Sequence, residues 1–322
     1  MLPFLYPLFN GRNKKAPYLI KGYLRFLSPK LLCRKQLSHI LEKGVAEYGE
    51  EFLEKRVNYY NKLSSEVRLS PEAPKISEHR LTKKRQVYFF DTEEYLRYFS
   101  GDLRWHSLSG DVTHIPEEPT IVKSRPIEGD NANSVLLKLN KVRHFVFVNS
   151  DILFSDKLDK AVFRGKIPHK PKRIRFFEQH FYNPLCDLGD TASHGDIPDE
   201  WRRPKLTIRE QLKYKFILAI EGNDVSSNLK WIMSSNSIAV MPRPEFETWF
   251  MEGRLIPGVH YIEINRDYSD LDEKIQYYSK NKDECLRIIS AANAYTEQFK
   301  DNKLEDLLSL LVLKKYFDLT NF

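Results

Sequence analysis

The sequence predicts an α/β protein in which a parallel sheet carries helices on both faces, with extra helices at the amino end. From residue 160 onward, short apolar segments alternate with single helical segments over about 100 residues, a rhythm typical of strands joined by crossover helices. Residues 36–66 place apolar side chains at helical spacing with charges between them. The chain has 322 residues, 41% of them hydrophobic, which is enough for two domains of about 150 residues.

The amino-terminal half is predicted as helix first and mixed structure afterwards. A connector rich in proline and charge follows the helical segment 36–66. Beyond it, strands are expected where aromatic and β-branched residues gather, and helices where charged residues space the apolar ones. The expected strands are 86–91, 102–110 and 144–149, and the expected helices are 91–100 and 134–140.

The carboxyl-terminal half has the more regular pattern, and each apolar run there is bounded by glycine, proline or polar residues. The expected strands are 160–165, 215–220, 237–241 and 259–264. The expected helices are 173–182, 228–235, 244–253 and those from residue 270 onward.

Composition and the absence of common catalytic motifs limit the classes of function that the chain can have. The chain carries 51 Lys and Arg against 44 Asp and Glu, a net charge of +7, which suits an anionic partner such as a nucleotide sugar, a phosphorylated lipid glycan, a membrane surface or a nucleic acid. The three scattered cysteines form no disulfide framework or zinc spacing, so we expect a reducing compartment. The sequence contains no HExxH, GxSxG or Walker A motif, which excludes zinc protease, serine hydrolase and P-loop functions.

The amino terminus leaves two interpretations open. Residues 1–15 are apolar and aromatic, then basic, and further cations follow as far as Lys30. Such a segment can lie at a lipid interface, or it can pack as an arm on its own protein. No apolar run approaches the roughly 20 residues of a membrane-spanning helix.

The most informative stretch for ligand binding follows the apolar strand at 215–220. There the chain enters a polar loop containing Gly222 and then a helix. In an open α/β sheet, ligands bind at the carboxyl ends of strands, where helix N-termini present N–H groups to phosphates. The polar members of this predicted diphosphate cradle are Asp224, Ser226, Ser227 and Lys230. Ordinary helix capping by Asp224 and Ser226 is the alternative.

A second candidate is Arg164 beside Gly165, directly after the strand 160–165. From that position a guanidinium could bind a phosphate in bidentate fashion. The side chains of Arg164 and Lys230 are both expected outside the core. Arg173 and Arg175 lie near the start of the next helix, where a solvated basic face is the alternative.

Acidic residues supply candidates for a general base. Asp111 and Asp91 each follow a predicted strand, and a carboxylate in a cleft can take a proton from a sugar hydroxyl. Either could equally cap a helix or form a turn. The pair Asp270 and Asp272 has the DxD spacing of some metal sites, but it lies at a predicted helix start, where acidic residues favour the helix dipole. We therefore interpret it as capping.

Taken together, these motifs resemble glycosyltransferase family 90. The resemblance is carried by KYKFILAIEGNDVSSNLKWIMSSNSIAVM (213–241), by AVFRG (161–165) and by the segment from Gly110 to His144. It covers about residues 85–300. One departure is Glu221, where many protein O-glucosyltransferases of the family have arginine.

The resemblance implies an inverting, metal-independent transferase of the GT-B type, with two Rossmann-like domains facing a cleft. It implies a UDP-sugar as co-substrate and no cofactor. The donor residues that match the family pattern are Arg164, Gly222, Ser226, Ser227 and Lys230, and their neighbours Gly165, Arg173 and Asp224 complete the predicted donor site. Asp111, with Pro116 five residues on, matches the family base, and Asp91 is held in reserve. Lys123, Arg125 and Glu247 are assigned to the acceptor side.

The expected division is an amino-terminal helical extension (1–80), an acceptor domain (81–158), a donor domain (159–300) and a carboxyl-terminal helix (301–322) that returns to the acceptor domain. The acceptor would be a lipid-linked or lipopolysaccharide glycan, or a capsular one. The sequence lacks a secretory signal, paired cysteines and an ER-retention ending. We therefore expect a bacterial cytoplasmic enzyme, peripheral on the inner face of the inner membrane. The alternative is a non-catalytic basic α/β protein that binds nucleic acid or anionic lipid through residues 172–182.

Overall fold

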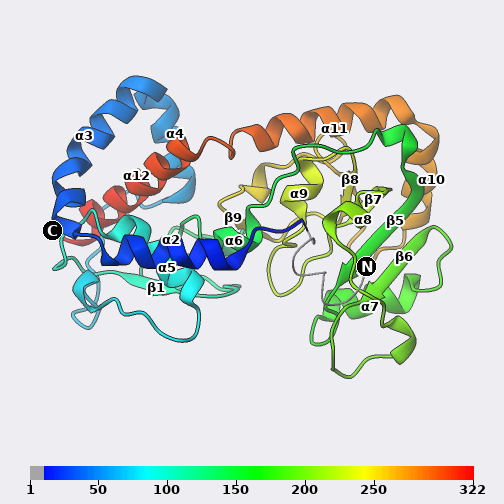
Figure 1. Ribbon diagram of the computed structural model, residues 1–322, viewed down its shortest axis with the longest axis horizontal. Helices are drawn as coiled ribbons and strands as arrows, with labels where there is room; N and C mark the ends of the chain where they lie inside the picture. The colour runs from blue at the N-terminus through cyan, green and yellow to red at the C-terminus, as the bar shows by residue number, and fades with distance from the viewer. Residues whose placement is uncertain (1–10) are drawn as a thin grey trace. The chain divides into compact units, whose positions relative to one another are not determined.

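The computed structural model describes residues 11–322 (Figure 1) and divides the chain into two compact units. Unit 1 contains Arg143–Pro244 and Glu252–Gln298, together with residues 11–13. Unit 2 contains Lys14–Val142, Glu245–Met251 and Phe299–Phe322. The boundaries expected at residues 80, 158 and 300 stay a prediction.

Unit 1 is built on a parallel sheet of five strands in the order β10-β8-β7-β5-β6. Its strands are β5 (Leu158–Gly165), β6 (Cys186–Asp190), β7 (Tyr214–Leu218), β8 (Ile238–Met241) and β10 (Ile262–Glu263). Its α-helices are α7 (Pro171–His180), α8 (Ile208–Gln211), α9 (Leu229–Met233), α10 (Leu271–Lys280) and α11 (Lys282–Glu297), and its 3-10 turns are η2 (Phe154–Asp156), η3 (Asp199–Trp201) and η4 (Glu252–Arg254).

The core of unit 1 follows from those apolar strands. Phe216 and Leu218 of β7 are fully buried, as is Val240 of β8. Phe176 of α7 and Leu271 of α10 close over the same cluster. Buried strands form continuous apolar runs in the sequence, which is why β5, β7, β8 and β10 could be predicted. β6, with the polar sequence CDLGD, was not predicted.

Unit 2 holds a parallel three-stranded sheet, β1-β2-β4, and an antiparallel pair, β3-β9. Its strands are β1 (His106–Leu108), β2 (Thr120–Val122), β3 (Ser124–Pro126), β4 (Ser134–Leu136) and β9 (Phe246–Thr248). Its helices are α2 (Lys15–Leu27), α3 (Lys30–Tyr48), α4 (Glu50–Tyr60), the turn η1 (Ile76–Glu78), α5 (Gln86–Leu96) and α12 (Asn302–Thr320). The short helix α6 (Lys141–His144) lies where the chain passes from unit 2 to unit 1.

The predicted strand at 86–91 is wrong, because this aromatic segment forms the first half of α5. Helix α2 packs tightly on it: a Cβ on Gly22 would lie 2.7 Å from Phe90 Cγ. The hydroxyl of Tyr18 donates to Asp91 at 2.6 Å. Tertiary packing overrides the strand preference of aromatic residues, which is weak and dependent on context.

Two predicted helices are also wrong. Residues 134–140 begin with β4, which pairs with β2 and is fully buried. Residues 244–253 contain β9, in which Glu247 lies opposite Arg125 of β3. The partners lie 14 positions away for β4 and 122 positions away for Glu247 of β9, outside either segment, so local helix preference did not decide the structure.

The predicted strand at 144–149 is wrong as well. Among the described residues this segment joins no sheet, and Val148 N–H donates to the hydroxyl of Ser234 at 2.9 Å. The helix predicted over 36–66 is confirmed for most of its length as α3 and α4. It is interrupted at Gly49, whose φ of 83° is readily adopted by glycine.

The α/β class with parallel sheets is confirmed. Within residues 11–322, no helix is both long and apolar enough to cross a membrane. The apolar start at residues 1–10, one of the two grounds for a lipid-facing amino terminus, lies outside the described residues.

Candidate functional site

The strand order of unit 1 creates a topological switch point. When the five strands are numbered along the chain, so that β5 is strand 1, β6 is strand 2 and β7 is strand 3, their order across the sheet is 2-1-3-4-5. This is a doubly wound order. The chain leaves β5 toward β6 on one side and leaves β7 toward β8 on the other. Pairing between β5 and β7 ends at Val162–Ile217, while β5 stays paired with β6 as far as Gly165. Ligands of such sheets bind in the crevice at the carboxyl ends of these two strands.

Three of the predicted donor residues meet at this point. Gly165 ends β5 and Gly222 lies in the loop after β7. The guanidinium of Arg173, from α7, lies between them: a Cβ on Gly165 would be 3.4 Å from Nη1, and one on Gly222 would be 3.3 Å from Nη2. Gly222 therefore leaves room for the arginine, whereas a Cβ on Gly165 would first meet the ring of Phe163, at 2.8 Å. Arg173 donates to the carbonyls of Ile220 and Lys166.

Two further cations, at the N-cap and in the first turn of α7, reach the loop after β7. Lys170 Nζ donates to the side chain of Asn223, and Lys172 forms an ion pair with Glu221 at 2.5 Å. With Arg173 they make a cationic cluster, the α7 cluster, at the carboxyl edge of the sheet. Sequence reasoning missed Lys170 and Lys172, although the run HKPKRIR (169–175) carried the signal.

The helix expected at 228–235 is present but shorter, and Asn228 is its N-cap residue. Helix α9 begins at Leu229 and has five residues, too few to build a substantial dipole. The amide of Asn228 donates to Leu218 O and accepts from the hydroxyl of Ser226. These bonds hold the loop against β7, and Asp224 is buried within it. Ser227 is half-buried at the end of the loop.

Lys230 was expected outside the core, and that expectation is wrong. Its side chain is 0% exposed, and Nζ lies 2.6 Å from Oε1 of Glu252, which is also buried. The pair joins α9 to the 3-10 turn η4 inside unit 1. A buried, directly paired lysine has the geometry of a structural residue, and its contact with a donor stays a prediction.

Arg164 was also expected outside the core, and its side chain is instead only 8% exposed. The guanidinium donates to the carbonyl of Asp187 and forms an ion pair with its carboxylate at 2.7 Å. The hydroxyl of Tyr214 donates to the same carboxylate, and burial raises the pKa of Tyr214 to about 12. The side chain thus bonds back to the amino end of β6. A phosphate contact by Arg164 stays a prediction and requires another rotamer.

Unit 2 carries the candidate base. Asp111 lies in the loop after β1, and its Oδ1 is 2.6 Å from Nζ of Lys123. The lysine side chain is 2% exposed and the aspartate side chain is 30% exposed. A buried ammonium therefore anchors a carboxylate that stays partly exposed, as a general base must be to reach a substrate.

The reserve candidate Asp91 has a different environment. It lies within α5 and not after a strand, and it is fully buried. Burial raises its pKa to about 6, opposed by the charge of Lys141 and by the hydrogen bond from Tyr18. An enclosed carboxylate of this kind has no surface on which to receive an acceptor hydroxyl, although its role as a base stays a prediction.

Arg125 and Glu247, assigned to the acceptor side, form a buried pair within unit 2. Arg125 Nε lies 2.8 Å from Oε1 of Glu247, which also accepts from Tyr59, and Arg125 donates to carbonyls of Tyr59 and Ser134. The pair bridges β3 and β9 and anchors the short strand 246–248 to its unit. Acceptor contact by either residue stays a prediction.

Comparison with known proteins identifies the family of the chain. A sequence model of the family described as glycosyl transferase family 90 matches residues 137–322, more than half of the chain. The chain belongs to glycosyltransferase family 90. The match includes β5, the α7 cluster and the loop after β7, so the switch point lies within the segment that defines this glycosyltransferase.

Two relatives are informative. The O-glucosyltransferase LpsA of Dichelobacter nodosus is 40% identical over 304 residues, which covers 94% of each chain. Protein O-glucosyltransferase 3 of Rattus norvegicus is 28% identical over 138 residues, 41% of this chain and 27% of the rat protein. Similarity to the bacterial protein therefore extends over both units of this family 90 glycosyltransferase.

The DxD residues of the family 90 chain lie at a helix start. Asp270 is the N-cap residue of α10 and accepts from the N–H of Asn265 at 2.7 Å, while Asp272, in the first turn, accepts from Asn183. Within residues 11–322, no three His, Cys, Asp or Glu side chains are grouped so that they could hold a metal ion.

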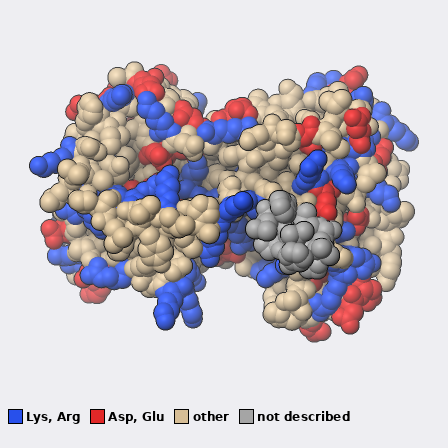
Figure 2. Space-filling view, viewed as in Figure 1, with Lys and Arg blue, Asp and Glu red and all other residues tan. Residues whose placement is uncertain are grey.

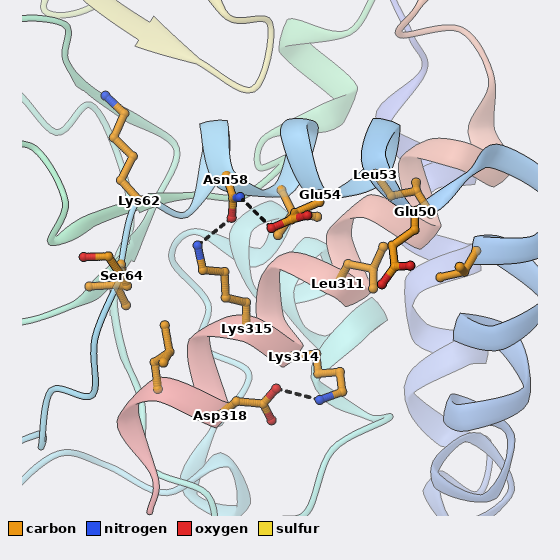
Figure 3. A pocket seen from close by; sticks show the side chains of 14 residues that line it. Glu50, Leu53, Glu54, Asn58, Lys62, Ser64, Leu311, Lys314, Lys315 and Asp318 are labelled. Carbon is orange, nitrogen blue, oxygen red and sulfur yellow. Dashed lines mark hydrogen bonds and ion pairs between the residues drawn. The ribbon is translucent and has the colours of Figure 1, made fainter.

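The family 90 chain also has a groove of about 850 Å³ in unit 2, between α4, α12 and residues 62–64. Figure 3 shows the charged side chains along it: Lys315 points to Asn58, and Lys314 points to Asp318. None of the predicted site residues lines this groove, so it is not part of the candidate site.

Proposed function

We propose that the protein transfers a sugar from a UDP-sugar to a hydroxyl of a glycan, with inversion at the anomeric carbon. The observation that carries the proposal is the α7 cluster at the switch point of unit 1, inside the segment matched by the family. Glucose is the first candidate for the sugar, since the bacterial relative bears the name O-glucosyltransferase.

The proposed base is a residue of unit 2. In unit 2, the carboxylate of Asp111 takes the proton of the acceptor hydroxyl, and the hydroxyl oxygen attacks the anomeric carbon of the sugar. The bond between that carbon and the UDP oxygen breaks as the new bond forms, and UDP leaves with the electron pair. Lys123 holds the carboxylate in place through the 2.6 Å contact.

In unit 1, fixed positive charge stabilises the departing diphosphate. The α7 cluster supplies it without a metal ion, as preorganised cations can do for charge that develops in a transition state. Arg173 is the central member because backbone carbonyls on two segments fix its guanidinium. The proposal therefore includes no metal and no cofactor.

We propose a lipid-linked or lipopolysaccharide glycan, or a capsular glycan, as acceptor, at the cytoplasmic face of a bacterial inner membrane. The bacterial source of the relative that matches over 94% of this chain supports the setting. The net charge of +7 supports a phosphorylated acceptor.

A donor screen tests the proposal. Purified protein is incubated with UDP-, GDP- and CMP-sugars, and release of the free nucleotide is measured with and without added glycan. We expect release from UDP-glucose or another UDP-sugar only. Release from a GDP- or CMP-sugar in its place would contradict the donor assignment.

The non-catalytic alternative loses its main support in the structure. It required several aromatic side chains of residues 172–182 to stack on bases, yet Phe176 and Phe177 are each 1% exposed and belong to the core of unit 1. Phe181 packs against that core, which leaves Tyr182, 80% exposed, as the one Phe or Tyr ring of this segment open to solvent. Stacking on nucleic acid bases requires exposed rings.

A further inference from the structure

Helix α2 has apolar side chains on two opposite faces. Its inner face packs on α5 through Tyr18, Gly22 and Phe26, and the ring of Phe26 lies 5.5 Å from that of Phe89. A surface helix needs one apolar face of this kind to attach to its protein. The opposite face is expected to be polar.

That outer face is instead strongly apolar. Ile20, Leu24 and Leu27 recur at helical spacing and are 60%, 67% and 78% exposed. Leu31 and Leu32, at the start of α3, continue the surface at 68% and 61% exposure. We call these five residues the outer stripe. Single exposed leucines are common, but a contiguous group marks an interaction surface.

The charged side chains of the segment around the outer stripe are all basic. The first 41 residues of the chain contain no Asp or Glu, against eight Lys and Arg. Arg25 and Lys30 pair with Glu94 and Glu93 of α5. The side chains of Lys14, Lys15 and Lys21 are exposed, and in the described part of the chain none forms an ion pair.

Figure 2 shows this surface where Figure 1 draws α2: uncharged atoms lie there with Lys and Arg atoms along their margins. Apolar side chains framed by cations are typical of segments that lie in a lipid interface, with the apolar part among the acyl chains and the cations at the phosphates.

We propose that the outer stripe docks the protein on an anionic membrane surface, with Lys14 and Lys21 facing lipid phosphates. A second copy of the chain fits this surface poorly. In a symmetric dimer the same patch would face itself, and its lysines would oppose lysines with no carboxylate in the segment to offset them. The proposal goes beyond glycosyl transfer and does not depend on it.

Vesicle flotation with the full chain tests the proposal. The probes are vesicles of phosphatidylcholine alone and vesicles with added phosphatidylglycerol. We expect binding to the second kind, weakened by salt because the Debye length falls from about 10 Å at 0.1 M to about 3 Å at 1 M. Leu24→Glu should lower the partition coefficient at least roughly 10-fold, since it removes an inserted leucine and adds a negative charge.

Matched variants elsewhere on the protein distinguish binding through the outer stripe from the effect of a changed net charge or of a lost exposed leucine. Leu286→Glu makes the same change at an exposed leucine of α11, 43% exposed, and should bind like the parent. Lys14→Glu/Lys21→Glu should lose binding, whereas Lys280→Glu/Lys282→Glu should keep it. Thermal unfolding verifies that each variant is folded.

Three results would overturn the proposal. The first is failure of the parent protein to float with either kind of vesicle at low salt. The second is equal loss in the α2 variants and their matched controls. The third is a parent that dimerises through this face, seen as a halved mass in Leu24→Glu, without vesicle binding.

Discussion

The buried pair of Lys230 and Glu252 allows a structural role to be separated from donor binding by one substitution. Both side chains are within 1% of full burial and their charged atoms lie 2.6 Å apart. Lys230→Ala leaves the Glu252 carboxylate in the interior without its lysine, which costs about 3–5 kcal/mol. For a domain of this size, that corresponds to a fall of roughly 6–20 °C in the melting temperature.

Urea unfolding of four proteins measures the effect: the parent, Lys230→Ala, Glu252→Gln and Lys230→Met/Glu252→Gln. We expect the double variant to lie within about 2 kcal/mol of the parent, because it leaves no buried charge unpaired. UDP affinity, measured at a temperature where each variant is folded, should change little. A Lys230→Ala protein of parental stability that has lost UDP affinity would refute the structural role and restore the lysine to the donor site.

Three further outcomes follow from the structure. Asp111→Asn should lower turnover in steady-state assays by roughly 10²–10⁴-fold with unchanged UDP affinity, while Asp91→Asn should stay active. An active Asp111→Asn enzyme beside an inactive Asp91→Asn enzyme would move the base to Asp91. Turnover should survive EDTA, and recovery only after Mn²⁺ or Mg²⁺ is added would contradict the metal-free donor site. Burial lowers the pKa of His79 from 6.5 to about 4. As the pH falls, His79 is therefore protonated in the unfolded chain at a higher pH than in the folded one. The free energy of unfolding should fall by up to about 3 kcal/mol between pH 6.5 and 4. His79→Phe, which can still stack on Phe89, should remove this loss in urea titrations at the two pH values.

The predictability of the fold differed between the units for a physical reason. In unit 1 the central strands β7 and β8 carry buried side chains on both faces, so Phe216 and Val240 belong to apolar runs that indicate a strand without further information. The polar strand β6 escaped prediction. All five strands of unit 2 have three residues, too few for an alternating pattern to identify them, and only β1 falls within a predicted strand. β9 is a strand because Glu247 meets Arg125, 122 positions away in the chain, and no local pattern contains that partner.

In the candidate site, too, contacts with residues from other segments could not be predicted from the local sequence. That Gly165 and Gly222 lie at one edge of the sheet could be predicted from the rule that parallel strands end together. The rotamer of Arg164 could not, because it depends on Asp187 of the neighbouring strand. Likewise, the burial of Lys230 depends on Glu252, whose segment was predicted as a helix.

Titration of UDP into the parent, Arg173→Ala and Arg175→Ala by isothermal calorimetry tests the central claim most directly. The two arginines lie on the same helix, but only Arg173 contacts the loop after β7, while Arg175 is exposed. Loss of a charge-assisted contact to phosphate costs about 1.5–3 kcal/mol. We therefore expect Arg173→Ala to bind UDP roughly 10- to 100-fold more weakly and Arg175→Ala to bind it like the parent. Equal UDP affinity in all three proteins would contradict a diphosphate site at the switch point of unit 1.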